Sequence, residues 1–313
     1  MSDKRIIAVM GATGAQGGGL VRAIHADPAG PFTARAITRN ASSDAAKALA
    51  ELGAEVVEAD VADGASIINA FKGADGAYCV TFYWAHMDPE REIAEAHTLA
   101  DAAKAADVKH VIWSTLEDTR KWVPLDSDQM PTIHDHYKVP HFDTKGESNR
   151  FFYNRVPTTF LLTSFYWDNF IYFGMNPKPD GQGRYSITLP TGDTKMPGIA
   201  AEDIGKCAYG IFKQGIVDKT VGISGEHVSG AEMAATLSEV LGIDCYFNAV
   251  TPEQFRGFGF PGADDLGNMF QFKVDFEKDF RGARDVETSR QFNPELMNFR
   301  QWCEKYKAQI PLT

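Results

Sequence analysis

The sequence has few cysteines and no apolar run long enough to cross a membrane. Its four cysteines, Cys79, Cys207, Cys245 and Cys303, stand singly, without the C-x-x-C spacing of a thiolate zinc site or the density of a disulfide framework. No stretch reaches the roughly 20 consecutive apolar residues of a membrane span, and the N-terminus has no signal-peptide pattern. These absences predict a cytoplasmic protein that does not enter a membrane.

Positive charge is also scarce. The 313 residues include 42 acidic side chains but only 31 lysines and arginines, so the net charge is -11. The negative electrostatic potential of such a chain repels nucleic-acid phosphates, which argues against direct binding of nucleic acid. The apolar residues, at 44% of the chain, suffice for one large domain or two modest ones.

The first half of the chain alternates short β-branched runs with amphipathic segments. This pattern is typical of βαβ units in a parallel sheet. The expected strands are 6–10, 33–38, 54–58, 76–81, 110–114 and 158–163. The expected helices are 17–26, 43–52, 65–71, 89–106 and about 141–154. Residues 1–163 are therefore predicted to form an α/β domain with a Rossmann-type doubly wound parallel sheet.

The composition of the sequence changes after residue 163, where aromatic residues, glycine and proline become frequent. Residues 164–313 are predicted to form a smaller, discontinuous α/β lobe over the carboxyl edge of the sheet, with 198–228 returning to the first domain. A turn at 191–193 is expected to join strands 185–189 and 194–196. Capping boxes predict helices after Ser229 and Thr251, and Asn293-Pro294 is expected to open the last helix. Residues 121–137 are expected to form a long functional or mobile loop.

A glycine-rich turn, G-A-T-G-A-Q-G, directly follows the first strand and precedes the first helix. Its glycines, Gly11, Gly14 and Gly17, would let the backbone turn sharply and approach a pyrophosphate at the helix N-terminus. Inside a βαβ run this motif predicts a dinucleotide-binding site. The alternative is a purely structural turn.

The end of the second strand indicates which dinucleotide binds. NAD sites usually place an acidic residue there, whereas this sequence has Thr38-Arg39-Asn40, and an arginine suits a 2′-phosphate. NADP(H) is therefore the predicted cofactor, with a solvated surface arginine as the alternative. Asp60 and Val61, after the third strand, are expected beside the adenine, although an Asp there can equally cap a helix.

Five segments together resemble the NmrA-like branch of the atypical short-chain dehydrogenase/reductases, and most of all its animal NADPH-sensing members. They are G-A-T-G-A-Q-G, T-R-N after the second strand, H-F-D-T-K-G-E, L-P-T-G-D and F-P-G-A-D-D-L-G-N-M-F-Q-F. The resemblance covers nearly the whole chain. It implies an NADP(H)-binding Rossmann domain that reports redox state to partner proteins in several relatives, whereas other branches of the superfamily are NADPH-dependent reductases.

The resemblance also implies the contacts of individual residues. Gly11, Thr13, Gly14, Ala15 and Gln16 match the phosphate-binding turn, Arg39 the 2′-phosphate contact, and Lys145 the lysine that holds the nicotinamide ribose. Catalytic members of the superfamily have a tyrosine four residues before this lysine, where this sequence has His141. His141 is then either a proton donor or a structural or cofactor contact. Ser114 falls where the substrate-polarising hydroxyl is expected, or else it caps a strand end.

Two aromatic triplets, Phe82-Tyr83-Trp84 and Phe165-Tyr166-Trp167, each follow a predicted strand. Ligands bind at this edge of open α/β sheets, so Thr81, Phe82 and Phe165 are predicted to contact the cofactor near the nicotinamide. Packing between the lobes is the alternative. Three histidines between 134 and 141, with two neighbouring aspartates, fit no familiar zinc spacing, so no metal is predicted.

Two functions are consistent with this sequence. The leading hypothesis is an NADP(H)-binding redox-sensing regulator that acts through a protein partner and whose loop 121–137 reorganises with cofactor occupancy. The alternative is an NADPH-dependent reductase of a small planar carbonyl or quinone, in which Lys145 orients the cofactor and Ser114 or His141 assists proton transfer. The sequence names neither substrate nor partner, and it leaves a homodimer open.

Overall fold

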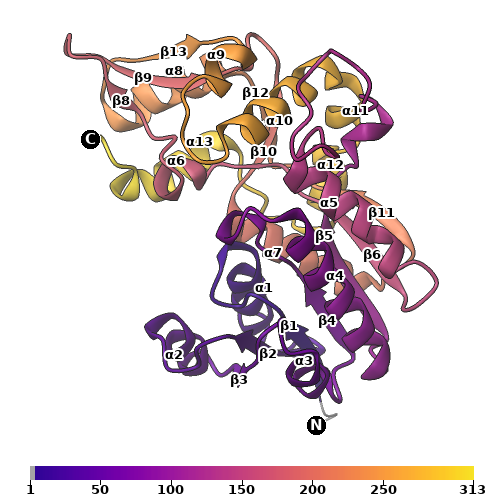
Figure 1. The fold of residues 1–313 in the computed structure, drawn as a ribbon. Helices are drawn as coiled ribbons and strands as arrows, with labels where there is room; N and C mark the ends of the chain where they lie inside the picture. The colour runs from indigo at the N-terminus through magenta and orange to yellow at the C-terminus, as the bar shows by residue number, and fades with distance from the viewer. Residues whose placement is uncertain (1–3) are drawn as a thin grey trace.

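The computed structural model describes residues 4–313, which form two lobes (Figure 1). The larger lobe, in the lower half of the view, is built on seven parallel strands in the order β11-β6-β5-β4-β1-β2-β3. Their bounds are β1 Arg5–Val9, β2 Phe32–Thr38, β3 Glu55–Glu58, β4 Gly76–Cys79, β5 His110–Thr115, β6 Thr158–Leu162 and β11 Lys219–Gly222. The predicted Rossmann-type sheet is thus confirmed.

The strand order places the candidate site. The chain moves outward from β1 through β2 to β3 and then returns to β4 on the other side of β1. Ligands of open α/β sheets bind at the carboxyl ends of the strands where the order reverses in this way, here between β1 and β4. The glycine-rich turn after β1 and the aromatic triplet after β4 therefore lie at the same edge of the sheet.

Helices cover both faces of the large sheet. On one face α1 (Ala15–His25) packs against α7 (Ala201–Gln214), and on the other α4 (Pro89–Ala105) packs between α3 (Gly64–Phe71) and α5 (Pro140–Ser148). The short α2 (Asp44–Glu51) lies against β2 and β3. A Cβ on Gly205 of α7 would lie only 2.1 Å from the Leu20 nitrogen of α1, so glycine permits this helix contact.

The predicted fifth helix ends earlier than expected. α5 stops at Ser148 and continues only as a 3-10 turn, Asn149–Phe151. At this point the Asn149 side chain turns inward and accepts hydrogen bonds from Trp113 Nε1 at 3.0 Å and Thr115 Oγ1 at 2.8 Å. These two bonds hold the end of α5 against β5.

The smaller lobe, at the top of Figure 1, contains two three-stranded sheets, ordered β12-β10-β7 and β13-β9-β8. The strands are β7 Phe165–Tyr166, β8 Lys178–Pro179, β9 Tyr185–Leu189, β10 Met196–Ile199, β12 Glu226–Val228 and β13 Cys245–Ala249. The helices that follow β6, apart from α7, are α6 Asn169–Tyr172, α8 Gly230–Leu241, α9 Pro252–Arg256, α10 Ala263–Asp275, α11 Glu277–Gly282, α12 Val286–Phe292 and α13 Phe299–Tyr306. Aromatic side chains, including buried Trp167 and Trp302, fill the core of this lobe.

The turn predicted at 191–193 lies between the two strands expected on either side of it, and these strands belong to different sheets. β9 pairs with β8 and β13, whereas β10 pairs with β7 and β12 in the other sheet. Because β10 runs to Ile199 and all its residues are buried, it lies inside the lobe rather than along β9. The turn at 191–193 therefore connects two sheets.

The predicted start of the last helix is wrong. Asn293 is buried and donates to Asp203 Oδ1 at 3.0 Å, so it anchors a turn rather than a helix. Asn298 is the N-cap of α13 and forms a capping box with Gln301. The capping boxes predicted at Ser229 and Thr251 are confirmed at the starts of α8 and α9.

No helix within residues 4–313 combines the length and the apolar character of a membrane span.

A buried histidine makes the stability of the large lobe depend on pH. His110, at the start of β5, has its Nε2 2.8 Å from Thr159 Oγ1, and burial lowers its pKa from 6.5 to about 4. The unfolded chain therefore takes up a proton on this imidazole at a higher pH than the folded protein does. The stabilising contribution is complete above the unfolded pKa and is lost as the pH falls toward about 4.

We expect the substitution His110→Gln to remove this pH dependence. Between about pH 7 and about pH 4.5, the free energy of unfolding should fall by about 2 kcal/mol more in the wild type than in the variant. Urea unfolding of both proteins at both pH values measures the difference, because the carboxylates that the two proteins share contribute equally. Equal decreases would contradict the assignment.

Candidate cofactor and active site

The glycine-rich turn connects β1 to α1. Gly11 has a φ of +60°, in the left-handed region that glycine enters without strain. A Cβ on Gly17 would lie 2.5 Å from the Gly11 carbonyl oxygen, so glycine allows the helix to begin this close to the strand. Gly14 is the N-cap and supplies no capping side chain, which leaves the first-turn amides of α1 for an anion, beside exposed Thr13 and Ala15. The turn therefore fits a pyrophosphate.

The side chain of Gln16 points into the protein beneath this turn. Its Nε2 donates to the Tyr166 hydroxyl at 2.5 Å, and its Oε1 accepts a hydrogen bond from the Tyr78 hydroxyl. Burial raises the pKa of both tyrosines above the ordinary value, so both phenols stay neutral. The Gln16 side chain is thus engaged within the protein, and its main-chain N–H is among the first-turn amides of α1.

Arg39 follows β2 and is exposed at the edge of the site. Among residues 4–313, no side chain or carbonyl forms an ion pair or hydrogen bond with its guanidinium, which is therefore free to bind a phosphate. Asp60, after β3, accepts the Ala62 N–H at 2.9 Å in a local turn, and Val61 is partly buried. The N-cap of the following helix is Asp63, not Asp60.

A buried aspartate fixes the first turn of α5. The Asp143 carboxylate accepts the N–H groups of Lys138 at 2.8 Å and Val139 at 3.0 Å, and both the N–H and the hydroxyl of Thr119. Burial raises the pKa of Asp143, and these hydrogen bonds oppose the rise. The bonds fix the helix that carries His141.

His141 is buried where the two lobes meet. Its Nδ1 lies 2.5 Å from Asp265 Oδ1, and its main-chain N–H donates to Oδ2 of the same carboxylate at 3.1 Å. Asp265 belongs to the first turn of α10, so the smaller lobe holds this histidine. The carboxylate keeps a proton on Nδ1, which leaves Nε2 on the opposite side of the ring. The Trp84 and Tyr83 rings lie 4.7 and 6.2 Å from the imidazole.

Lys145 stands one helical turn after His141 in a buried polar cluster. Its Nζ lies 2.8 Å from Glu92 Oε1 and donates to Thr81 Oγ1 at 2.6 Å. The Thr81 hydroxyl donates to the same Glu92 oxygen at 2.5 Å. The Glu92 side chain is 1% exposed, so its charge depends on these partners for compensation.

Ser114 lies on the other face of the sheet from Lys145. Successive residues of a strand point to opposite faces, and its neighbours Trp113 and Thr115 both contact Lys145. The Ser114 hydroxyl instead faces Tyr78, where it opposes the rise that burial causes in the tyrosine pKa. The structure therefore does not bring Ser114 together with His141.

The aromatic triplets separate into different environments. Phe82 is 62% exposed at the edge of the site, next to Tyr83 and Trp84, which face His141. Phe165, by contrast, is buried in the core of the smaller lobe, where it contacts Phe170 and Phe270. Trp167 is buried in the same core. Of the second triplet, Tyr166 is thus the residue that reaches the glycine-rich turn.

Two residues of this site, Glu92 and Asp265, were not predicted. Glu92 shares the buried stripe of α4 with Pro89, Ala96 and Leu99, and a carboxylate in an apolar stripe is the signal that could have identified it. Asp265 lies in α10, whose residues from 265 to 273 are all buried. Its polar residues, Asp265, Asn268 and Gln271, are buried against α5 and the preceding loop, so they cannot be told from surface residues by sequence alone.

The loop between β5 and α5 is bound to α10. Asn268 Nδ2 donates to the carbonyl oxygens of Pro131 at 2.8 Å and Lys138 at 2.6 Å, and Gln271 Nε2 donates to the Gln129 carbonyl at 2.7 Å. The same helix therefore holds both the loop and, through Asp265, the histidine.

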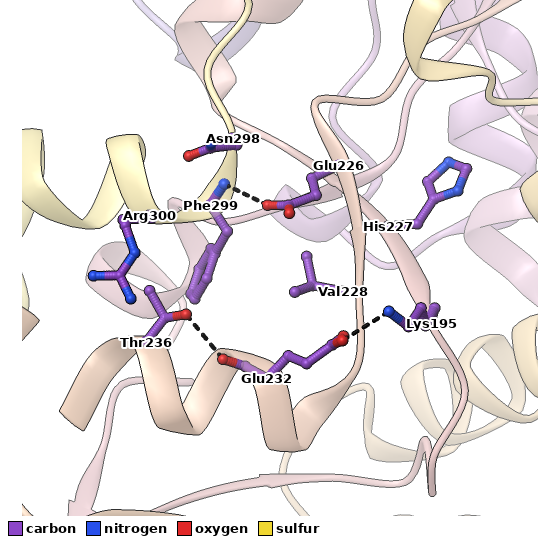
Figure 2. Close-up of a pocket in the computed structure, with 9 residues that line it drawn as sticks. All are labelled: Lys195, Glu226, His227, Val228, Glu232, Thr236, Asn298, Phe299 and Arg300. Carbon is purple, nitrogen blue, oxygen red and sulfur yellow. Dashed lines mark hydrogen bonds and ion pairs between the residues drawn. The ribbon is translucent and has the colours of Figure 1, made fainter. Parts of the chain in front are cut away.

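A hollow of about 280 Å³ lies in the smaller lobe (Figure 2). Lys195 lies 2.7 Å from Glu232, and Arg300 pairs with Glu239 at the edge of the hollow. Glu226 forms no ion pair within residues 4–313, and its carboxylate accepts the Phe299 N–H at 2.9 Å. These contacts stabilise the lobe.

Comparison with known proteins gives the family. Residues 3–304 match the NmrA-like family. A curated relative from Cladobotryum sp, the NmrA-like family domain-containing oxidoreductase FrzB, is 31% identical over 297 residues, covering 85% of this chain and 83% of the relative. The chain therefore belongs to the NmrA-like family, a family of Rossmann-type nucleotide-binding proteins.

Solved structures share the whole fold. NmrA, a negative transcriptional regulator crystallised with NADP, has a TM-score of 0.77 at 21% identity and covers 96% of this chain and 95% of its own. The Citrobacter triphenylmethane reductase complexed with NADP(H) has a TM-score of 0.72 at 21% identity, over 96% and 99% of the two chains. The NADP(H) prediction agrees with the cofactors in these complexes.

We expect Arg39→Ala to weaken NADPH binding selectively. Removing one charge-assisted contact to the 2′-phosphate should raise the Kd for NADPH roughly 10- to 100-fold, while the Kd for NADH, which lacks that phosphate, should stay unchanged. Isothermal titration of both cofactors against both proteins measures this. Equal losses for the two cofactors would contradict the 2′-phosphate contact.

Proposed function

We propose that this protein is an NADPH-dependent reductase in which His141 donates the proton. The observation that carries the proposal is the Asp265–His141 pair, 2.5 Å between Oδ1 and Nδ1, one helical turn from Lys145. A carboxylate on one imidazole nitrogen leaves the other oriented for proton transfer, as in known catalytic dyads and triads. Histidine can thus replace the tyrosine of related reductases.

Different residues of the site serve cofactor binding and proton transfer. The first-turn amides of α1 bind the pyrophosphate, and Arg39 binds the 2′-phosphate. Lys145 orients the nicotinamide ribose. When bound, NADPH supplies the hydride that is added to the carbonyl carbon. The carbonyl oxygen takes the proton from Nε2 of the His141 imidazolium, whose charge Asp265 balances, and solvent then returns a proton to the neutral ring.

The side chains around His141 favour a planar substrate. The Trp84 ring lies 4.7 Å from the imidazole and 5.8 Å from the ring of exposed Phe173. Aromatic walls of this kind bind flat, largely apolar molecules by stacking. A small planar carbonyl or quinone therefore fits the site best.

The test is NADPH oxidation by the purified protein with a panel of quinones, aldehydes and aromatic enones. His141→Gln should lower kcat by about 100-fold or more, because the proton donor is lost, while the Kd for NADPH stays within about twofold. Asp265→Asn should lower kcat too. Asp264→Asn, which changes the exposed neighbouring carboxylate in the same helical turn, is the matched control and should keep full activity.

Turnover that survives in His141→Gln would overturn the assignment of the proton donor. An absence of turnover with every acceptor, with NADPH still bound, would overturn the reductase proposal.

A redox-sensing regulator that acts through a protein partner is the second candidate. It is favoured by α10, which holds both His141 and the loop at residues 129–138. A change of cofactor state at the histidine could thereby reach the exposed tip of the loop, where a partner would bind. The regulator among the solved relatives is consistent with this reading.

The sensor hypothesis predicts that the loop distinguishes the two cofactor states. Hydrogen exchange of residues 124–137 should differ between the NADPH and NADP⁺ complexes, and Asn268→Ala, which frees the loop, should abolish that difference. Identical exchange in the two complexes of the wild type would count against a sensor.

A further inference from the structure

Glu92, which pairs with Lys145 through Oε1, also faces a buried histidine, His86, through its other oxygen. Glu92 Oε2 and His86 Nε2 are 3.5 Å apart, and neither has a hydrogen bond of good geometry within residues 4–313. The two side chains are 1% and 8% exposed. Buried polar atoms without a close partner are rare, and they often indicate a functional constraint.

The tautomer of His86 follows from its other nitrogen. Nδ1 accepts the main-chain N–H of Asp88 at 3.0 Å, so Nδ1 carries no proton and the proton of the neutral ring is on Nε2. That N–H faces the Glu92 carboxylate. His86 therefore presents a donor to the same carboxylate that pairs with Lys145.

This tautomer argues against a metal ion at the cluster of His86, Glu92 and Glu95, whose candidate ligand atoms lie within 4.8 Å of one another. A metal on Nε2 would require the proton on Nδ1, where it would oppose the Asp88 N–H. The Lys145 ammonium on Glu92 would also repel a cation. The cluster fits a proton-bearing histidine instead.

Three acceptors surround the Lys145 ammonium within residues 4–313. The two short contacts are to Glu92 Oε1 at 2.8 Å and Thr81 Oγ1 at 2.6 Å, and the Thr81 carbonyl oxygen accepts a longer hydrogen bond at 3.2 Å. Because the charged Glu92 partner and the Thr81 side chain hold the ammonium closely, its position is defined. Glu92 in turn is held by Thr81 and faces His86.

We propose that Glu92, backed by His86, is a positioning residue that holds the Lys145 ammonium where it contacts the nicotinamide ribose. The inference rests on the cofactor site of the proposed function, but it requires no turnover. Glu92 acts through Lys145 alone and touches neither cofactor nor substrate. Its loss should therefore weaken only ligands that possess the nicotinamide ribose.

The experiment compares the binding of NADPH with that of 2′,5′-ADP, which carries the 2′-phosphate but lacks the nicotinamide ribose. Glu92→Gln should raise the Kd for NADPH about 10-fold and leave the Kd for 2′,5′-ADP unchanged. His86→Leu should have the same selectivity with a smaller effect. Glu90→Gln, the same charge change at an exposed position in the first turn of α4, is the matched control and should alter neither Kd.

A double-mutant cycle tests whether Glu92 acts through the lysine. In a Lys145→Met background, adding Glu92→Gln should cause no further change in the Kd for NADPH. This double variant also removes both members of the buried ion pair, so it avoids the unpaired charge that could unfold the single variant.

An equal loss for NADPH and 2′,5′-ADP in Glu92→Gln, or a full effect of Glu92→Gln without Lys145, would overturn the inference. Inactivity toward every acceptor, with the selective Kd change intact, would remove the reductase proposal and leave this inference standing.

Discussion

The hydrogen-bonded pair between His141 and Asp265 is the interaction on which the architecture of the site depends. The histidine comes from the nucleotide-binding lobe and the aspartate from the first turn of α10 in the smaller lobe. The next polar residues of α10, Asn268 and Gln271, bind the main chain of the loop that leads to α5. A buried carboxylate with these partners is costly to separate from them, so the lobes are held in one relative position. The site therefore has a histidine with one defined tautomer and one defined orientation.

The two cations of the candidate cofactor site, Arg39 and Lys145, differ in burial and in ion pairing. Arg39 is exposed and unpaired within residues 4–313. Such a guanidinium suits a doubly charged phosphate, because the opposite charges attract each other strongly. Lys145 is buried and paired with Glu92, which suits a ribose hydroxyl, because a neutral group gains little from net charge and much from a correctly directed donor.

The sequence predicts the parts of this molecule that are local in the chain. The large sheet, the glycine-rich turn, Arg39 and the spacing of His141 and Lys145 depend on short-range patterns, and the fold contains them. The arrangement of the smaller lobe was not predictable in the same way, because strands such as Phe165–Tyr166 have two residues and α10 is buried over most of its length. Asp265 meets His141 across 124 positions, and Ser114 faces away from it because of strand alternation that the motif alone does not reveal.

The loop that Asn268 and Gln271 hold has a consequence for how such proteins can diversify. Recombination between relatives preserves function when the exchanged blocks carry their mutual contacts with them. Here α10 forms hydrogen bonds with both α5 and the loop before it, although α10 lies in the other lobe and far along the chain. The three segments therefore depend on one another for their positions. Exchange of the smaller lobe as an independent module would therefore break the histidine site, whereas inheritance of these three segments from one parent would keep it. The segments that must be inherited together in this fold are therefore defined by contacts between the lobes and not by the boundary between them.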